Sequence, residues 1–341
     1  MRAVSICLAL LVAAAAGAAV PPAHFSHKDW EIACDNTGTC RTAGYAPDTG
    51  ENGFSLLLQR PAGPGTGVQG RLRFGGFDDQ VAPRGALRLW LNGRDLGPLA
   101  AAVDGVHRLH RVQTAALLAA LPRRAAITVS DAAGARWTIS DAGASAVLLR
   151  MDEAQGRLGT PGALVRVGTR AENSVPAPTP LAALRPAPAL QPTRPADAAL
   201  AGEPVLRAAL RASLPPTQDC DGLRPGDDAL PLEVERLDDR RLLVSTRCWR
   251  GAYNEGNGYW VVNDHAPWAP AQVTLDGSDF ERYGASIVAA QKGRGLGDCF
   301  WTARWRWQGT GFVLAHEQTS GQCRGFAGGA WDLPTHVSAG Q

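Results

Sequence analysis

Six cysteines remain in this chain once its N-terminal leader is set aside, and they constrain the fold more than any other feature. The 341 residues contain seven cysteines, and Cys7 lies inside the leader. An even number of cysteines in an exported chain is typical of a disulfide framework. We favour the pairing in which each bridge encloses a short segment of chain, namely Cys34–Cys40, Cys220–Cys248 and Cys299–Cys323. Other pairings of the last four cysteines stay open, because six cysteines allow about 15 connectivities.

The leader has the three parts of a secretory signal peptide. Arg2 supplies a positive start, residues 4–16 are apolar, and Ala16-Gly17-Ala18 is a small-residue cleavage site. We therefore expect residues 1–18 to be removed and the protein to be periplasmic or secreted. No later apolar run reaches the ~18 residues of a membrane span, so no transmembrane segment is expected.

Charge and composition exclude some functions. The net charge is +2, from 34 basic and 32 acidic residues, which gives no field to attract nucleic acid. Only Lys28 and Lys292 are lysines. The arginines are scattered along the chain, which favours a coding bias over selection for anionic ligands. No CxxC and no histidine suitably spaced beside a cysteine is present, so we expect no metal site and no cofactor.

The pattern predicts a mainly β (α+β) protein of two antiparallel domains with a few short helices. The first covers residues 23–158, with strands, two hairpins and two helices. A Pro/Ala-rich linker follows at 159–198, where closely spaced prolines favour an extended, semi-rigid chain. The second covers residues 199–337 and contains one helix, then seven strands joined by short turns, an antiparallel meander that forms a sandwich or a barrel-like sheet.

Tryptophans alternate with arginines in one strand of the second domain. Trp301, Trp305 and Trp307 share one face, while Arg304 and Arg306 share the other. We favour core packing for the tryptophans over stacking on a sugar, because a half-buried strand needs one apolar face.

A glycine-rich stretch between two strands offers the best candidate site. Aromatic rings, amides and a carboxylate together suit a sugar or a peptide, although a turn-rich loop with no ligand has the same composition. The binding candidates are Tyr253, Asn254, Glu255, Asn257, Tyr259 and Trp260.

Catalysis is less favoured than binding, because no established catalytic motif occurs in the chain. The catalytic candidates are Glu255, Asp264 and His265. Glu255 and Asp264 would act as the paired carboxylates of a glycosidase, and His265 as a general base.

Two regions resemble a known family. Residues 27–45 followed by 54–75 look like its start, and residues 248–262 and 298–314 look like its later half. This is the domain of unknown function 1176 family, which consists of exported proteobacterial proteins. Residues 30–40 are also similar to invasion-associated locus B proteins. The resemblance implies an envelope or periplasmic location and assigns no residue a role.

The sequence therefore favours an exported, non-catalytic envelope protein that binds a glycan or a protein partner, including an inhibitor-like role. One alternative is a secreted hydrolase that acts on envelope glycan. The other is a structural protein with no ligand site.

Overall fold

The computed structural model describes residues 23–47, 53–77, 83–226 and 229–340. The expected signal peptide, residues 1–18, lies outside them. The first eleven strands are β1 Ala23–His27, β2 Trp30–Cys34, β3 Cys40–Tyr45, β4 Phe54–Arg60, β5 Gln69–Phe74, β6 Arg88–Leu91, β7 Arg94–Pro98, β8 Val106–Arg108, β9 Ile127–Ser130, β10 Arg136–Ile139 and β11 Ala182–Ala183. The other ten are β12 Glu233–Arg236, β13 Arg241–Arg250, β14 Glu255–Asn263, β15 Ala271–Gly277, β16 Asp279–Glu281, β17 Ser286–Lys292, β18 Phe300–Trp307, β19 Phe312–Thr319, β20 Leu333–His336 and β21 Ser338–Ala339.

The described helices are few and short. They are α1 Arg111–Ala120, α2 Ala144–Ala154, α3 Pro195–Ala199 and α4 Pro204–Ala212. None of them has the length and apolar content needed to cross a lipid bilayer. Because strands dominate and nearly all pair antiparallel, the prediction of a mainly β fold is confirmed.

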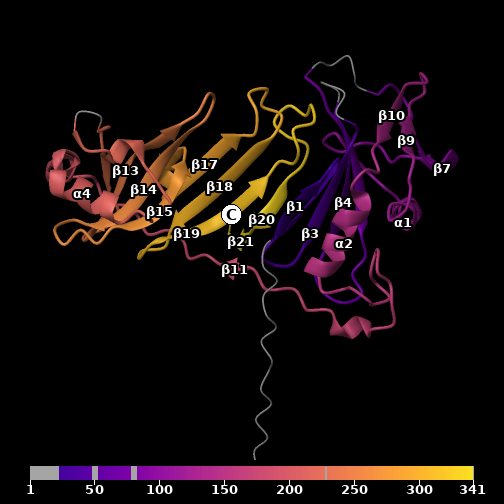
Figure 1. The fold of residues 1–341 in the computed structure, drawn as a ribbon, viewed down its shortest axis with the longest axis horizontal. Helices are drawn as coiled ribbons and strands as arrows, with labels where there is room; N and C mark the ends of the chain where they lie inside the picture. The colour runs from indigo at the N-terminus through magenta and orange to yellow at the C-terminus, as the bar shows by residue number, and fades with distance from the viewer. Residues whose placement is uncertain (1–22, 48–52, 78–82, 227–228, 341) are drawn as a thin grey trace, which may run out of the picture.

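The first half of the chain is built on a six-stranded sheet in the order β1-β2-β3-β4-β5-β8. Alternation along its strands sends Trp30, Ile32, Leu56 and Leu72 to an inner face, where all four are fully buried. Helix α2 and a second sheet, β10-β9-β6-β7, pack on that face and close the core (Figure 1).

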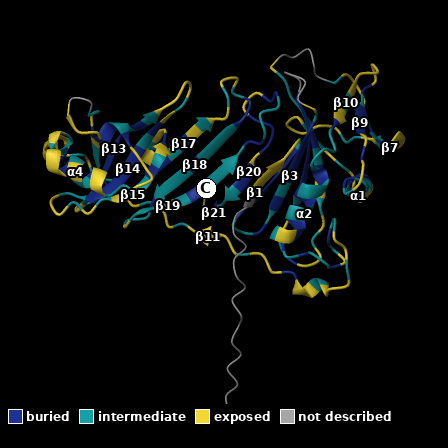
Figure 2. Ribbon diagram, in the orientation of Figure 1, coloured by how far each residue is buried: buried dark blue, intermediate teal, exposed yellow. Residues whose placement is uncertain are grey.

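The second half contains two open sheets, in the orders β12-β13-β14-β15 and β16-β17-β18-β19-β20. The strands do not close, so the sandwich-like alternative holds and the barrel-like one is wrong. Helix α4 covers one face of the first sheet with the buried Leu206 and Leu210. The other face packs against the second sheet, and the fully buried Trp307 belongs to this core. Figure 2 shows this burial along the strands of both sheets.

The Pro-rich segment is fastened along its length. Asp152 on α2 accepts hydrogen bonds from the backbone N–H groups of Leu164 and Val165. Further on, β11 pairs in parallel with β21, and the backbone of Arg185 hydrogen-bonds the side chain of Gln308. The segment therefore contacts both halves of the chain rather than acting as a free spacer.

The last part of the chain returns to the first half. Residues 320–338, here called the covering segment, lie on the outer face of the six-stranded sheet, beside β1 and β2 (Figure 1). Phe326, Trp331 and Leu333 are buried there against side chains of the sheet, among them Ala43 and Leu57. A hydrophobic cluster thus joins β2 and β3, near the start of the chain, to the covering segment near its end.

Candidate functional site

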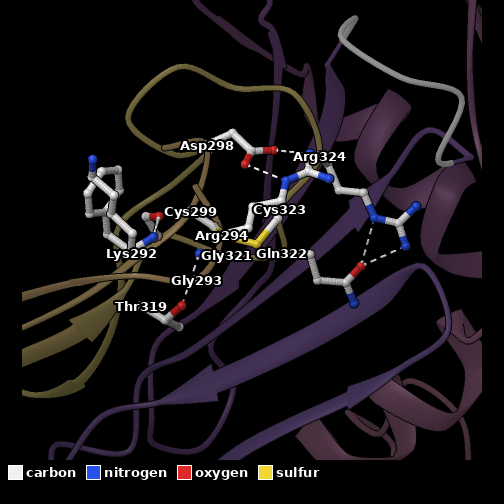
Figure 3. Close-up of a disulfide and its surroundings, with 12 residues drawn as sticks. Lys292, Gly293, Arg294, Asp298, Cys299, Thr319, Gly321, Gln322, Cys323 and Arg324 are labelled. Carbon is white, nitrogen blue, oxygen red and sulfur yellow. Dashed lines mark hydrogen bonds and ion pairs between the residues drawn. A yellow bond between two sulfur atoms is a disulfide. The ribbon is translucent and has the colours of Figure 1, made fainter. Parts of the chain in front are cut away.

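The structure contains the three favoured disulfides, Cys34–Cys40, Cys220–Cys248 and Cys299–Cys323. The third ties the start of β18 to the covering segment (Figure 3). Beside it, the fully buried Asp298 accepts from the Nε of Arg294 at 2.7 Å and from the backbone N–H of Gly325 at 2.8 Å. This disulfide and its neighbours therefore fix where the covering segment starts.

The same disulfide also bears on metal binding. Asp298, Cys299 and Cys323 are the one group of three possible metal ligands among the described residues. Because both sulfurs are bonded to each other, they are not thiolates, which is the form that binds metal.

The binding candidates of the glycine-rich stretch do not form one ligand surface. Tyr259 and Trp260 are 4% and 0% exposed, so they are core residues. Asn254 donates to the carbonyl of Lys292 at 2.8 Å and accepts from its N–H at 2.9 Å. Tyr253 is 48% exposed, and its hydroxyl donates to the carbonyl of Gly293 at 3.3 Å. Tyr259 and Trp260 therefore belong to the core, and Asn254 holds its loop to the backbone of Lys292.

Glu255 and Asn257 line a cavity of about 340 Å³ at the first sheet of the second half. Glu255 is exposed, as a solvated carboxylate on a surface would be. The residues lining this cavity are Leu230, Pro231, Glu233, Ser245, Thr246, Arg247, Glu255 and Asn257.

The catalytic candidates are far apart. Glu255 begins β14 and Asp264 follows its end, nine residues later. At the rise of an extended strand this is roughly 25–30 Å, whereas the carboxylates of a glycosidase lie about 5–9.5 Å apart. The paired-carboxylate hydrolase built on these two residues is therefore wrong.

Asp264 and His265 belong to an ion-pair cluster. The guanidinium of Arg236, 2% exposed, lies 3.3 Å from a carboxylate oxygen of Asp264 and 2.5 Å from one of Asp197. His265 Nδ1 lies 2.7 Å from the other carboxylate oxygen of Asp264. Asp264 thus neutralises a buried cation, which is a structural role.

A larger cavity than the one at Glu255 and Asn257 lies where the covering segment crosses the outer face of the six-stranded sheet. Its volume is about 510 Å³, which suits a small-molecule site. We call it the junction pocket. Its lining consists of Arg41, Leu57, Gln59, Arg71, Arg73 and Val106 from the sheet, and Ser320, Ala327, Gly328, Gly329, Trp331, Asp332 and Pro334 from the covering segment.

Three arginines meet at this pocket because neighbouring strands place them on one face. Arg41 on β3 pairs with Gln59 on β4, and Leu57 on β4 pairs with Arg71 on β5. Arg73 follows Arg71 by two residues and so points to the same side. Arginines that are scattered in the sequence thus converge on one face of the sheet at this point of the fold.

The electrostatics of Arg71 are those of a crowded cation. Burial, and then the positive charges of Arg108 and Arg41, lower the pKa of Arg71. Its Nη2 donates to the Oε1 of Gln59. Its Nε is buried and has no hydrogen-bond partner among the residues that the structure describes.

Comparisons with known proteins match nearly the whole length of the chain. A family model described as "Protein of unknown function (DUF1176)" matches residues 24–338. "Uncharacterized protein YpfG" of Escherichia coli (strain K12) is 31% identical over 338 residues, which are 91% of this chain and 92% of that protein. No solved structure matches significantly. The match spans both halves together with the covering segment, and the chain belongs to the DUF1176 family.

Proposed function

We propose that this protein is an exported, non-catalytic envelope protein that binds its ligand in the junction pocket. The observation that carries the proposal is the pocket itself, a cavity of about 510 Å³ whose walls come from both ends of the chain. Ligand sites are clefts or cavities of roughly 300–1,000 Å³, and this cavity falls within that range.

The walls of the pocket are held firmly. The indole N–H of Trp331 donates to the hydroxyl of Ser55 at 2.8 Å, and Arg73 donates to the carbonyl of Ala330 at 2.8 Å. A rigid site loses little conformational entropy when it binds. This supports binding in the pocket by a glycan fragment or by a segment of a protein partner.

An oxidising location is supported by the cysteines. All six cysteines in the described residues are paired, and such pairing is typical of proteins outside the cytoplasm. Together with the leader pattern of residues 1–18, this supports a periplasmic or secreted protein.

The test fills the pocket without touching the core. Ala327 lines the pocket and is exposed, so Ala327→Trp should fold and occupy the cavity. The matched control is Ala133→Trp, at an exposed hairpin turn in the first half. Binding of residues 19–341 to soluble envelope glycan fragments and to a lysozyme would be measured by calorimetry.

We expect binding that Ala327→Trp abolishes and Ala133→Trp preserves. Binding that survives Ala327→Trp would place the site outside the junction pocket. A panel without any binding would contradict the proposal as a whole.

A further inference from the structure

We propose that the junction pocket holds an anionic group of its ligand, a carboxylate or a phosphate, on the guanidinium groups of Arg71 and Arg73. This inference rests on the proposed function and adds the chemistry of the ligand to it.

The charge of the pocket is the first argument. Arg41 is neutralised by the buried Asp35, whose carboxylate lies 2.8 Å from its Nη1. No carboxylate of the described residues forms an ion pair with Arg71 or Arg73. Asp332 also lines the pocket, but its carboxylate is exposed and accepts from Gln318 at 3.2 Å. Two guanidinium charges therefore lie in one cavity, and no carboxylate of the described residues is ion-paired with either of them.

The available hydrogen-bond donors are the second argument. A guanidinium presents five N–H donors in a planar fork that matches the oxygens of carboxylate and phosphate. Nη2 of Arg71 donates to the side-chain oxygen of Gln59, and Nη1 of Arg73 donates to the carbonyl of Ala330 at 2.8 Å. The buried Nε of Arg71 still lacks an acceptor among the described residues. An anion in the pocket would supply that acceptor.

Repulsion between like charges is the third argument. Arg71 is flanked by Arg41 on one side and by Arg108, its direct partner on β8, on the other. Holding cations together in a partly buried site costs free energy. A bound anion relieves that cost, and so its binding is favoured by the same charges that destabilise the empty site.

A neutral sugar fits the pocket less well. Trp331, the one aromatic residue of the lining, is only 6% exposed, so its ring offers little surface for stacking. The side-chain oxygen of Gln59 already accepts from Arg71. The unpartnered Nε of Arg71 is a charged donor, and such a donor bonds an anionic oxygen more strongly than a neutral hydroxyl.

The test uses three probes on the protein without its leader, residues 19–341, at low ionic strength. Calorimetry would measure the binding of inorganic phosphate, of glucuronate as a carboxylated sugar, and of glucose as its neutral counterpart. We expect phosphate or glucuronate to bind and glucose not to bind, and the anion that binds identifies the source of the charge. Binding should weaken as salt is added, because charge attraction is screened.

A matched pair of variants assigns the binding to the pocket. Ala327→Glu places a negative charge at the exposed rim, and Ala327→Gln places a side chain of the same shape without the charge. We expect the glutamate variant to bind the anion about tenfold or more weakly than the glutamine variant. Arg71→Gln should weaken binding to a similar extent, with folding checked by circular dichroism.

Each other outcome has a definite meaning. Binding of glucose as tightly as glucuronate would overturn the anion site and leave the proposed function in place. Anion binding that both Ala327→Glu and Arg71→Gln leave unchanged would overturn it too, because the anion would then lie elsewhere. Failure of both anions to bind would overturn it as well, while the glycan and lysozyme panel still decides the proposed function.

Discussion

Glu31 is a buried carboxylate whose partners come from distant parts of the chain. Its Oε1 accepts from the hydroxyl of Tyr45 at 2.5 Å and from the backbone N–H of Gln322 at 2.6 Å. Its Oε2 lies 3.2 Å from the Nε2 of His24. Because the side chain is nearly inaccessible to water, each of these partners is needed to offset the cost of burying the charge. One residue thus connects the first strand, the sheet and the covering segment.

The pair of His24 and Glu31 predicts a pH dependence of stability. The hydrogen bond to Glu31 raises the pKa of His24 above 6.5, its value in the unfolded chain. The pair therefore stabilises the fold fully below pH 6.5, and this contribution is lost as the pH rises through the higher, folded pKa. Thermal unfolding between pH 5 and 8.5 should show that His24→Gln lowers the melting temperature at the acidic end only. The control is His27→Gln, the same exchange on the same strand. An equal effect of His24→Gln at all pH values would contradict the prediction.

Asp264 gives a second prediction at this scale, since it was a catalytic candidate and now has a structural role. Asp264→Asn removes one of the two carboxylates that neutralise Arg236. We expect a loss of about 1–2 kcal/mol in the free energy of unfolding, measured in urea. Asp104→Asn, at an exposed turn, should change it by less than about 0.5 kcal/mol. An unchanged free energy in Asp264→Asn would show that Asp197 alone suffices.

At the scale of elements, the two disulfides of the second half have similar loops but different duties. Cys299 and Cys323 are 24 residues apart, and Cys220 and Cys248 are 28 apart. The first pair anchors the covering segment, whereas the second joins a loop after α4 to β13. Similar loop lengths imply similar entropic stabilisation, roughly 3 kcal/mol for each disulfide. The two disulfides therefore differ in which part of the structure loosens when each is removed.

We therefore predict different patterns of hydrogen exchange in two double variants. Replacing Cys299 and Cys323 by serine should speed amide exchange in residues 320–338, because the start of the covering segment is released. Replacing Cys220 and Cys248 by serine should speed exchange near β13 and leave the covering segment protected. Unchanged protection of residues 320–338 in the first variant would mean that packing alone holds the segment.

The elements that the sequence predicted are those with a strong local pattern. One of the two predicted hairpins has the strong turn pair Asn92-Gly93; it forms between β6 and β7, and both turn residues have positive φ, as such a turn requires. On the tryptophan face of β18, Trp307 is fully buried as the alternation indicates, whereas Trp301 and Trp305 are only half-buried. Two edge strands, β16 and β20, were not predicted, because three or four residues are too few to show a period.

The junction pocket could not be predicted from the sequence, for a different reason. Arg71 and Arg73 alternate with Leu72, which by itself predicts two arginines on one strand face. What makes a pocket is the covering segment above them, and Arg73 meets Ala330 across 257 residues. No local pattern reports a contact of that range, since it depends on the packing of the whole chain.

At the scale of the whole molecule, the covering segment makes the two halves depend on each other. Phe326 is 2% exposed and packs on the backbone at the end of β5 in the six-stranded sheet. A Cβ added to Gly75 there would lie 2.2 Å from the Phe326 ring. Trp331 and Leu333 extend this contact. The prediction of two domains, residues 23–158 and 199–337, therefore concerns units that share a hydrophobic cluster, and a shared cluster couples their unfolding.

We predict that the protein unfolds in a single calorimetric transition and that Phe326→Ala separates it into two. Removing a buried phenylalanine costs about 3–5 kcal/mol, and here the loss falls on the contact between the halves rather than within either core. Phe25→Ala, which truncates a phenylalanine that is 38% exposed on β1, should keep the single transition. Two transitions in the unmodified protein would show that the halves are thermodynamically independent. A single transition in Phe326→Ala, with equal calorimetric and van't Hoff enthalpies, would show that other contacts couple them, of which the fastened segment at residues 159–198 is the first to test.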